Sequence, residues 1–161
     1  MTDTDAGKIA ELLESFEIAQ LTTIDERYRL VSRPMLPLYT QFDGRFWFFA
    51  HSESRVATHI AHRASVNVSF ASPKAWLSFA GIADIVRDAE IAASLWTTDL
   101  APWFPGGIDP AQTSLVQFTA DEARYWQSPG AMETLVQLVA PRSRSTPARP
   151  RTSGLSLKAN R

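Results

Sequence analysis

The sequence predicts a mainly β protein, an antiparallel β-barrel with flanking helices, formed by residues 1–140 of a chain of 161. Short runs of β-branched and aromatic residues recur along the chain and are separated by turn residues. Asp43-Gly44 stands between two of these runs, and this dipeptide is typical of a tight hairpin because both positions tolerate positive φ. About seven short strands, joined by hairpins and interrupted by helices, favour a barrel.

The first half of the domain begins with a helix, which Thr4 or Asp5 would cap. Its apolar residues follow the i, i+3, i+4, i+7 spacing of a single stripe: Ile9, Leu12, Leu13 and Phe16. Strands are expected at residues 18–24, 27–35, 36–42 and 45–50, with a turn at 25–26. The sequence therefore predicts a packing helix followed by antiparallel strands.

The second half begins with a helix at residues 54–63, capped by Ser52 or Ser54, with Val56 and Ile60 facing inward. Alternating residues predict a strand at 66–70, and a turn at 72–74 leads to a long strand at 75–86. Asp88 is expected to cap a helix that precedes a loop rich in Pro and Gly. The remaining elements expected are a strand near residues 114–118 and a C-terminal helix marked by Met132, Leu135, Val136 and Val139.

The composition limits the chemistry that the side chains can perform. The chain has no cysteine, which excludes disulfides, thiolate metal sites and a thiol nucleophile. It has no run of ~18 apolar residues, and its N-terminus, MTDTDAGK, lacks the pattern of a signal peptide. We therefore expect a cytoplasmic protein whose redox chemistry, where it has any, comes from a bound cofactor.

The charge is unevenly distributed along the chain. All 17 acidic residues precede Pro141, whereas six basic residues follow it: Arg142, Arg144, Arg149, Arg151, Lys158 and Arg161. Residues 141–161 also contain several prolines and serines and have no apolar face, so a basic, disordered tail is expected. A solubilising tail is favoured over an arm that binds nucleic acid, although basic arms can meet phosphates without folding.

The common catalytic motifs are absent, including the GxSxG elbow, the phosphate loop, GxGxxG and HExxH. His59 and His62 lie three residues apart on the helix expected at 54–63, but no carboxylate on that helix has a spacing that would complete a metal site. Solvated helix histidines are far commoner than metal ligands, and we expect no metal.

Two basic positions stand out from this background. Arg33-Pro34-Met35 ends one strand, and Ser54-Arg55 opens a helix just after the strand GRFWFFA. A helix N-terminus offers free N–H groups and a positive dipole, so Ser54 and Arg55 are placed to hold a phosphate, with Arg33 as a second charge. The residues alone leave another interpretation open, in which Ser54 only caps the helix and both arginines form solvated ion pairs.

The chain resembles the split-barrel flavoproteins related to pyridoxamine 5′-phosphate oxidase, and more narrowly the general stress protein 26 branch. The resemblance spans residues 18–126. It rests on an ordered series of fragments: AQLTTID, SRPM, DGRFWFFAHSESRV, VNVSF, SFAGIADIVRD, WFPGGIDP and ARYW. The resemblance implies a six-stranded antiparallel split barrel that forms a homodimer, with FMN in each of two clefts at the subunit interface.

The resemblance also assigns cofactor-binding roles by position. Arg33, Pro34 and Met35 would line the cofactor, Phe49 and Ala50 would flank the flavin, and Ser54 with Arg55 would hold its phosphate. Trp76 would reach the cofactor of the partner subunit. Trp103 and Phe104 belong to the loop expected over the flavin ring.

The chain departs from pyridoxamine 5′-phosphate oxidases at two places. Val56 stands where those enzymes have a lysine directly after the matching arginine, and the C-terminal Arg and His pattern for their substrate is missing. We therefore do not expect vitamin B6 oxidation. The resemblance implies an FMN-binding general stress protein and, as its activity, a flavin-dependent oxidoreductase of unknown substrate. Alternatives are a non-enzymatic flavin carrier or sensor and a reductase that uses the deazaflavin F420. FAD is an alternative to FMN.

Overall fold

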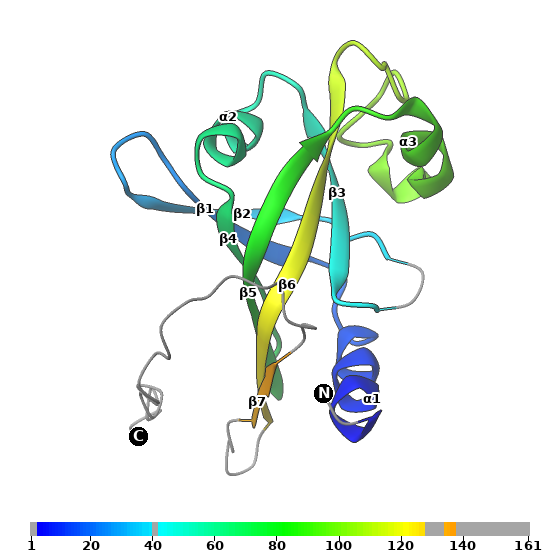
Figure 1. Cartoon of the computed structure of the whole chain (residues 1–161). Helices are drawn as coiled ribbons and strands as arrows, with labels where there is room; N and C mark the ends of the chain where they lie inside the picture. The colour runs from blue at the N-terminus through cyan, green and yellow to red at the C-terminus, as the bar shows by residue number, and fades with distance from the viewer. Residues whose placement is uncertain (1–2, 40–41, 128–133, 138–161) are drawn as a thin grey trace.

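A single curled sheet organises the protein in the computed structural model, which describes residues 3–39, 42–127 and 134–137 (Figure 1). The helices are α1 (Asp3–Leu13), α2 (Arg55–His62), α3 (Ala89–Leu95) and the short 3₁₀ helix η1 (Thr98–Leu100). The strands are β1 (Ala19–Ile24), β2 (Leu30–Met35), β3 (Arg45–His51), β4 (Ser65–Ala71), β5 (Ala75–Val86), β6 (Thr113–Gln127) and β7 (Thr134–Gln137).

All strand pairs of this sheet are antiparallel. Six strands follow the order β2-β1-β4-β5-β6-β3, and β7 pairs with β6 outside this path. The sheet curls so that the β1–β2 ribbon runs across the direction of β5, β6 and β3 (Figure 1). The six-stranded antiparallel split barrel with flanking helices, which the sequence predicts, is confirmed.

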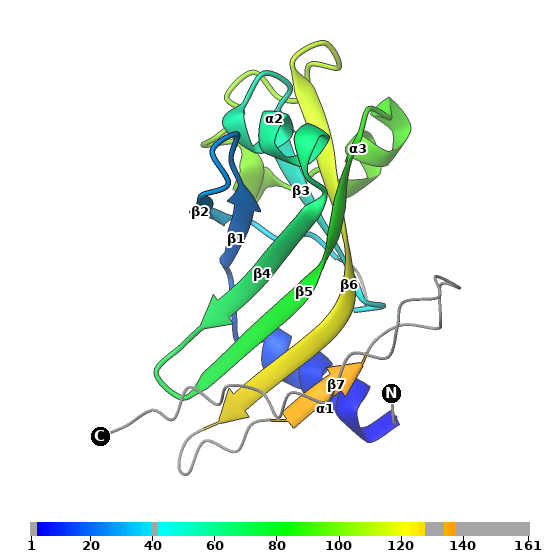
Figure 2. The same cartoon turned by 60° about the vertical axis from the view of Figure 1, so that its left-hand side comes forward.

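Aromatic side chains fill the inside of the curl. Phe46 lies at the centre with its side chain fully buried, and its ring contacts those of Phe70, Phe79 and Phe118 at centroid distances of 5.5, 5.1 and 6.1 Å. Helix α1 covers one end of the curl and adds Ile9, Leu12 and Leu13 to this core (Figures 1 and 2). Helices α2 and α3 lie at the other end.

The two longest strands, β5 and β6, lie close together at Gly81. The register between β5 and β6 shifts at Ala80/Gly81. A Cβ atom built at Gly81 would lie 2.1 Å from the carbonyl oxygen of Thr119, a separation that no real side chain tolerates. A bulge increases the local twist of a strand, so Gly81 permits the bend at this point of the sheet.

Several elements follow the sequence closely. Ser54 caps α2 through a bond from the Ala57 N–H, and Asp88 caps α3, as predicted. Val56 and Ile60 are buried, as expected. The long strand at 75–86 is confirmed.

Two predictions at other elements are wrong, and a third, the strand near residues 114–118, is confirmed but too short. Residues 36–42 do not form a strand, because the described part of this segment pairs only through the isolated bridge between Leu38 and Trp47. The strand near 114–118 continues to Gln127, because its second half pairs with the first half of β5. The C-terminal helix is replaced at Thr134–Gln137 by β7, whose pairing with β6 overrides the helical spacing.

Some predicted features lie outside the described residues: Met132 and Val139 of the expected C-terminal helix, and the tail at 141–161. Among the helices that the structure describes, none has the length and apolar character needed to cross a bilayer.

Candidate functional site

The β1–β2 ribbon and α2 form the part of the molecule where predicted site residues gather. Arg33 on β2 lies opposite Leu21 on β1, so both side chains lie on one face of the ribbon. Thr23 follows two residues after Leu21 on the same face, because side chains alternate along a strand. Thr23 contacts His59 of α2, so this is the face that α2 covers. Arg33 therefore points toward the side of the ribbon that α2 occupies.

Arg33 has a donor with no acceptor. Its guanidinium is half-buried, and Nη1 makes one long bond of 3.5 Å to the carbonyl oxygen of Leu21. Nη2 is buried and has no hydrogen-bond partner. Burial, and then the positive charge of Arg55, lower the pKa of the Arg33 guanidinium. The positive charges of Arg33, on β2, and Arg55, at the start of α2, therefore repel each other.

No carboxylate balances these two charges in the described part of the chain. The ion pairs there involve other arginines and Lys8, and none includes Arg33 or Arg55. The interpretation that both arginines form solvated ion pairs is therefore not what the described residues show. An unpaired buried donor carries a cost that a bound anion would remove.

The first turn of α2 adds backbone donors beside Arg55. The Ser54 hydroxyl oxygen accepts from the Ala57 N–H at 3.3 Å. The N–H groups of Arg55 and Val56 come earlier in the helix, where no intrahelical acceptor exists. Together with the positive end of the helix dipole, they suit an anion. Val56 itself has its side chain in the core, so only its backbone is available.

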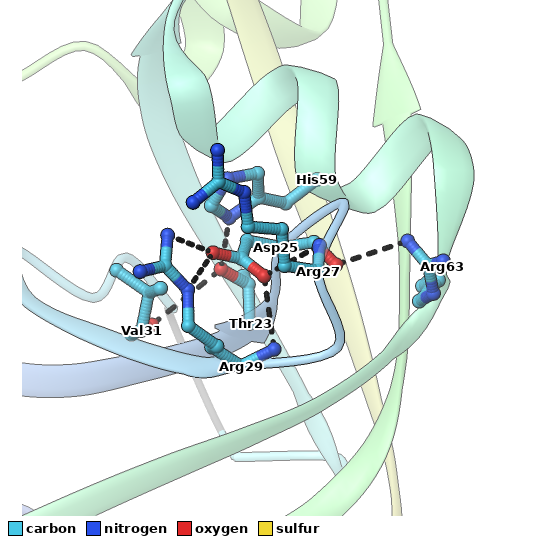
Figure 3. Close-up of polar contacts among 7 residues, drawn as sticks. All are labelled: Thr23, Asp25, Arg27, Arg29, Val31, His59 and Arg63. Atoms are coloured by element: carbon cyan, nitrogen blue, oxygen red, sulfur yellow. Dashed lines mark hydrogen bonds and ion pairs between the residues drawn. The ribbon is translucent and has the colours of Figure 1, made fainter.

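His59 is a residue of this region that the sequence interpretation placed wrongly. Its side chain is 1% exposed instead of solvated, because Val56, His59 and Ile60 share the buried face of α2 at i, i+3 and i+4. Nδ1 lies 2.8 Å from the Thr23 hydroxyl oxygen, and Nε2 is buried without a partner (Figure 3). His62 is exposed and contacts the carbonyl oxygen of Thr58, so the two rings have separate partners.

Charged groups around His59 affect its protonation. Burial has the largest effect and lowers the pKa of the imidazole, and the positive charge of Arg33 follows. Glu26 raises the pKa, Arg55 lowers it, and Asp25 raises it, in decreasing order of effect. The ring is therefore held neutral among cationic neighbours.

The turn between β1 and β2 fixes the ribbon that carries Arg33. The Asp25 carboxylate is 0% exposed and accepts from the backbone N–H groups of Arg27 and Arg29, both at 2.9 Å (Figure 3). The Arg29 guanidinium forms an ion pair with it at 2.7 Å. The backbone bond from Arg29 is the largest cause that lowers the pKa of Asp25 to about 2.

Arg63 connects the same turn to the end of α2. Its guanidinium donates to the carbonyl oxygen of Asp25 at 3.1 Å and lies 4.0 Å above the centre of the Tyr28 ring. Tyr28 has a φ of 62°, in the left-handed region that is unusual for a bulky residue. The turn and α2 are therefore held together, and the sequence patterns predict only the Asp25-Glu26 turn of this network.

The aromatic residues predicted near the flavin divide into buried and exposed ones. Phe49 and Ala50 are buried on β3. Phe104 is also buried, with its ring 5.8 Å from that of Phe49 and 4.8 Å from that of His51. Trp103 is 58% exposed. Phe104 thus attaches the loop after η1 to the end of β3.

A hollow of about 450 Å³ lies directly before α2. It is lined by the residues between β3 and the helix cap and by the turn before β6: His51, Ser52, Glu53, Ala111 and Gln112. This hollow gives space at the helix start, next to Ser54.

Trp76 and the remaining residues of β2 complete the predicted set. Pro34 is exposed, and Met35 is half-buried against the core. Trp76 is 38% exposed near the start of β5, at the end of that strand away from α2 (Figure 2). One chain therefore brings together Arg33 and Arg55, with Ser54 beside Arg55 at the start of α2, but not Trp76.

Comparisons with known proteins were made for the sequence and the fold. The profile of a family described as "Pyridoxamine 5'-phosphate oxidase like" matches residues 4–145. Among curated protein sequences, none matches the chain.

Solved structures share the fold at low sequence identity. One, from Clostridium acetobutylicum, is named a protein related to general stress protein 26, with TM-score 0.74, 21% identity, and 86% of this chain and 97% of that chain covered. A general stress FMN/FAD binding protein from Xanthomonas citri has TM-score 0.68, 21% identity, and coverages of 87% and 100%. A heme binding protein from Mycobacterium smegmatis has TM-score 0.68, 14% identity, and coverages of 85% and 59%.

The low pKa of Asp25 predicts how the stability of the fold changes at acid pH. Because the pKa is about 2 in the folded chain and 3.8 ordinarily, ionised Asp25 stabilises the fold above the ordinary value, and this contribution is lost as pH falls toward 2. We expect Asp25→Asn to lower the melting temperature at pH 7 and the difference from wild type to shrink at acid pH.

Thermal unfolding followed by circular dichroism from pH 7 down to roughly pH 2 measures this difference. Asp43→Asn is the matched control, because Asp43 is an exposed turn aspartate that also accepts from a backbone N–H, that of Arg45. A difference between Asp25→Asn and wild type that stays constant with pH would show that the charge of Asp25 is not what stabilises the turn.

Proposed function

The chain belongs to the pyridoxamine 5′-phosphate oxidase-like family, and on that premise we propose that it binds FMN and is a flavin-dependent oxidoreductase. The observation that carries the proposal is the unpartnered Nη2 of Arg33 beside the charge of Arg55. A flavin mononucleotide has a phosphate that would supply the missing anion. The likeness to an FMN/FAD binding stress protein from Xanthomonas citri supports the same ligand.

The phosphate end of the flavin would lie at the start of α2. Arg33 and Arg55 would provide charge-assisted hydrogen bonds, and the first N–H groups of α2 would provide neutral ones. FMN suits this arrangement better than FAD, because its terminal phosphate carries up to two negative charges opposite two arginines.

The ring end of the flavin would lie along β2. Among the described strands, β2 pairs only with β1, so the backbone groups in Arg33-Pro34-Met35 that point away from β1 would be available to hydrogen-bond the ring. These groups alternate along the strand, and Pro34 has only a carbonyl oxygen to offer. When bound, the flavin would supply the redox chemistry, and the protein would supply orientation and electrostatics. We propose that Phe49, Ala50, Trp103 and Phe104 limit the access of water to the ring.

We also propose that the protein is a homodimer in which Trp76 approaches the flavin held by the partner subunit. Trp76 and Trp103 are among the exposed large hydrophobic side chains, and burying them would stabilise an interface.

Sedimentation at micromolar concentration tests this proposal. We expect a species near twice the chain mass of 17.9 kDa. Trp76→Ala should weaken both the dimer and flavin binding. A wild-type protein that sediments only as a single chain would refute the shared site.

The substrate is proposed to differ from that of pyridoxamine 5′-phosphate oxidases. Val56 is 5% exposed and packs in the core, so this position cannot offer the side-chain charge of a lysine. A non-enzymatic carrier remains the second candidate, because hydride transfer to a flavin requires no acid or base that would identify an enzyme.

The absorption spectrum of the purified protein distinguishes these functions. We expect a flavin band that is bleached when a reduced nicotinamide is added without oxygen. A bound flavin that no such donor reduces would favour the carrier. A protein without any flavin band, to which neither added FMN nor FAD binds, would refute the proposed function, and a deazaflavin band would identify F420 instead.

Arg55→Ala tests where the phosphate lies. A charge-assisted hydrogen bond to phosphate contributes about 1.5–3 kcal/mol, so we expect FMN affinity to fall roughly tenfold to somewhat over a hundredfold. Riboflavin has no phosphate and should bind as it does to wild type. Arg33→Ala should act in the same way if Arg33 reaches the phosphate.

Titration of each variant with FMN and with riboflavin measures this difference. Arg45→Ala is the control, since Arg45 is an exposed arginine that interacts with Asp43. If Arg55→Ala lowers the affinities for FMN and riboflavin equally, Arg55 contacts a part of the cofactor other than the phosphate. If it changes neither affinity, Arg55 is a solvated side chain that does not contact the cofactor.

A further inference from the structure

His59 is a buried polar side chain with one satisfied nitrogen and one unsatisfied nitrogen. Nδ1 lies 2.8 Å from the Thr23 hydroxyl oxygen, and Nε2 is buried with no partner. The side chain is 1% exposed, so water does not reach it readily. A buried polar atom without a partner is costly, which suggests that Nε2 meets a group that is not part of the chain.

The contact with Thr23 indicates which nitrogen carries the proton. The only other acceptor recorded for the Thr23 hydroxyl, among the described residues, is the carbonyl oxygen of Val31 at 3.5 Å, at the limit of a hydrogen bond. A hydroxyl donates to one acceptor at a time, so Nδ1 at 2.8 Å is the better acceptor for its hydrogen. In a neutral imidazole the proton then sits on Nε2, which makes Nε2 a donor.

Arg33 supports the same assignment. Its Nη2 is a buried donor with no partner, and its charge acts on His59. If Nε2 of His59 were a bare acceptor, a neighbouring guanidinium N–H would be a suitable partner, yet neither atom has one. Both groups lack an acceptor, and the charge of Arg33 acts on the His59 ring, so a single anion is the acceptor that would suit both.

The position of His59 on α2 leads to the same place. Arg55 and His59 are four residues apart, so their side chains lie on adjacent turns of one helix face. Thr23, the partner of His59, lies two residues along β1 from Leu21, the residue opposite Arg33. The ribbon and the helix thus present Arg33, Arg55 and His59 toward a common region.

We propose that His59 is a third ligand of the anion, donating from Nε2 to the phosphate of FMN that Arg33 and Arg55 hold. This proposal rests on the proposed function and adds a residue and a proton to it. Thr23 is the positioning residue, because its hydroxyl fixes the orientation and tautomer of the ring.

A bound phosphate would change the protonation of His59. Without it, burial and the charges of Arg33 and Arg55 lower the pKa of the ring, while Glu26 and Asp25 act in the opposite direction. A phosphate with nearly two negative charges would raise the pKa of His59, so the protein would take up a proton when FMN binds. This proton would go to Nδ1, and the Thr23 hydroxyl would then accept from Nδ1 and turn its own hydrogen toward the carbonyl oxygen of Val31. Riboflavin, which lacks this charge, would not cause the uptake.

Two substitutions at His59 separate its roles. His59→Asn keeps a polar atom near Thr23 but does not reach the position of Nε2, and we expect FMN to bind about tenfold more weakly with riboflavin unchanged. His59→Gln can reach that position with an amide N–H, so it should recover part of the affinity without proton uptake. His62→Asn is the control, because His62 is an exposed histidine on the same helix.

Calorimetric titration of the full chain, freed of flavin, in buffers of different ionisation enthalpy measures the proton uptake. We expect the wild type to take up more protons than His59→Asn when FMN binds, and the two proteins to take up equal numbers when riboflavin binds. The FMN phosphate itself titrates near pH 6, and the comparison with His59→Asn cancels this contribution. A His59→Asn protein with the wild-type ratio of FMN to riboflavin affinity would overturn the proposal.

A second measurement uses the wild type alone and does not depend on whether a variant folds. The ¹⁵N shifts of the His59 ring should show the Nε2–H tautomer without ligand and move toward imidazolium with FMN. Unchanged ring shifts in the FMN complex would overturn the proposal. If the wild type binds no flavin, the proposed function fails, and inorganic phosphate becomes the probe: movement of the same shifts supports the role of His59, and their constancy overturns it.

Discussion

The close pairing of β5 with β6 is the constraint on which the rest of the structure depends. The two strands pair from Ala75 to Val86, with a register shift at Gly81, where the backbone of β6 leaves no room for a side chain. This bend curls the sheet, and the curl lets the β1–β2 ribbon run across the other strands. Helix α2 can then pack on the ribbon, which brings Arg33 and Arg55 to one place.

The candidate site contrasts with the core that supports it. Aromatic rings around Phe46 fill the inside of the curl, and the Asp25 turn satisfies its carboxylate with backbone and side-chain donors. The donors of Arg33 and His59 remain unsatisfied at the adjoining face. Among the described residues these two side chains hold the buried polar atoms without a partner, which supports the proposal that a ligand completes this face, because unpaired buried donors reduce stability unless function retains them.

Short sequence patterns predicted the features that depend on residues close together in the chain. The caps Ser54 and Asp88 and the alternation along β4 and β5 were readable, because each depends on neighbours in the sequence. The length of β6 and the existence of β7 depend on pairing across the sheet, which propensity does not encode. His59 was predicted as solvated, although its i+3 spacing from Val56 was a usable signal of burial. Its contact with Thr23 could not be predicted, since it joins distant segments.

Fold likeness alone does not determine the cofactor. Structures of similar TM-score include one named an FMN/FAD binding protein and one named a heme binding protein, both below 25% identity to this chain. The ligand must therefore be argued from side chains that differ between such proteins. In the described part of the chain neither Arg33 nor Arg55 forms an ion pair with a carboxylate, which favours a ligand with a compact, concentrated negative charge. With the Thr23 hydroxyl as donor to Nδ1, the proton of a neutral His59 ring sits on the unpartnered Nε2, which supports the proposal that a phosphate completes this cluster of donors.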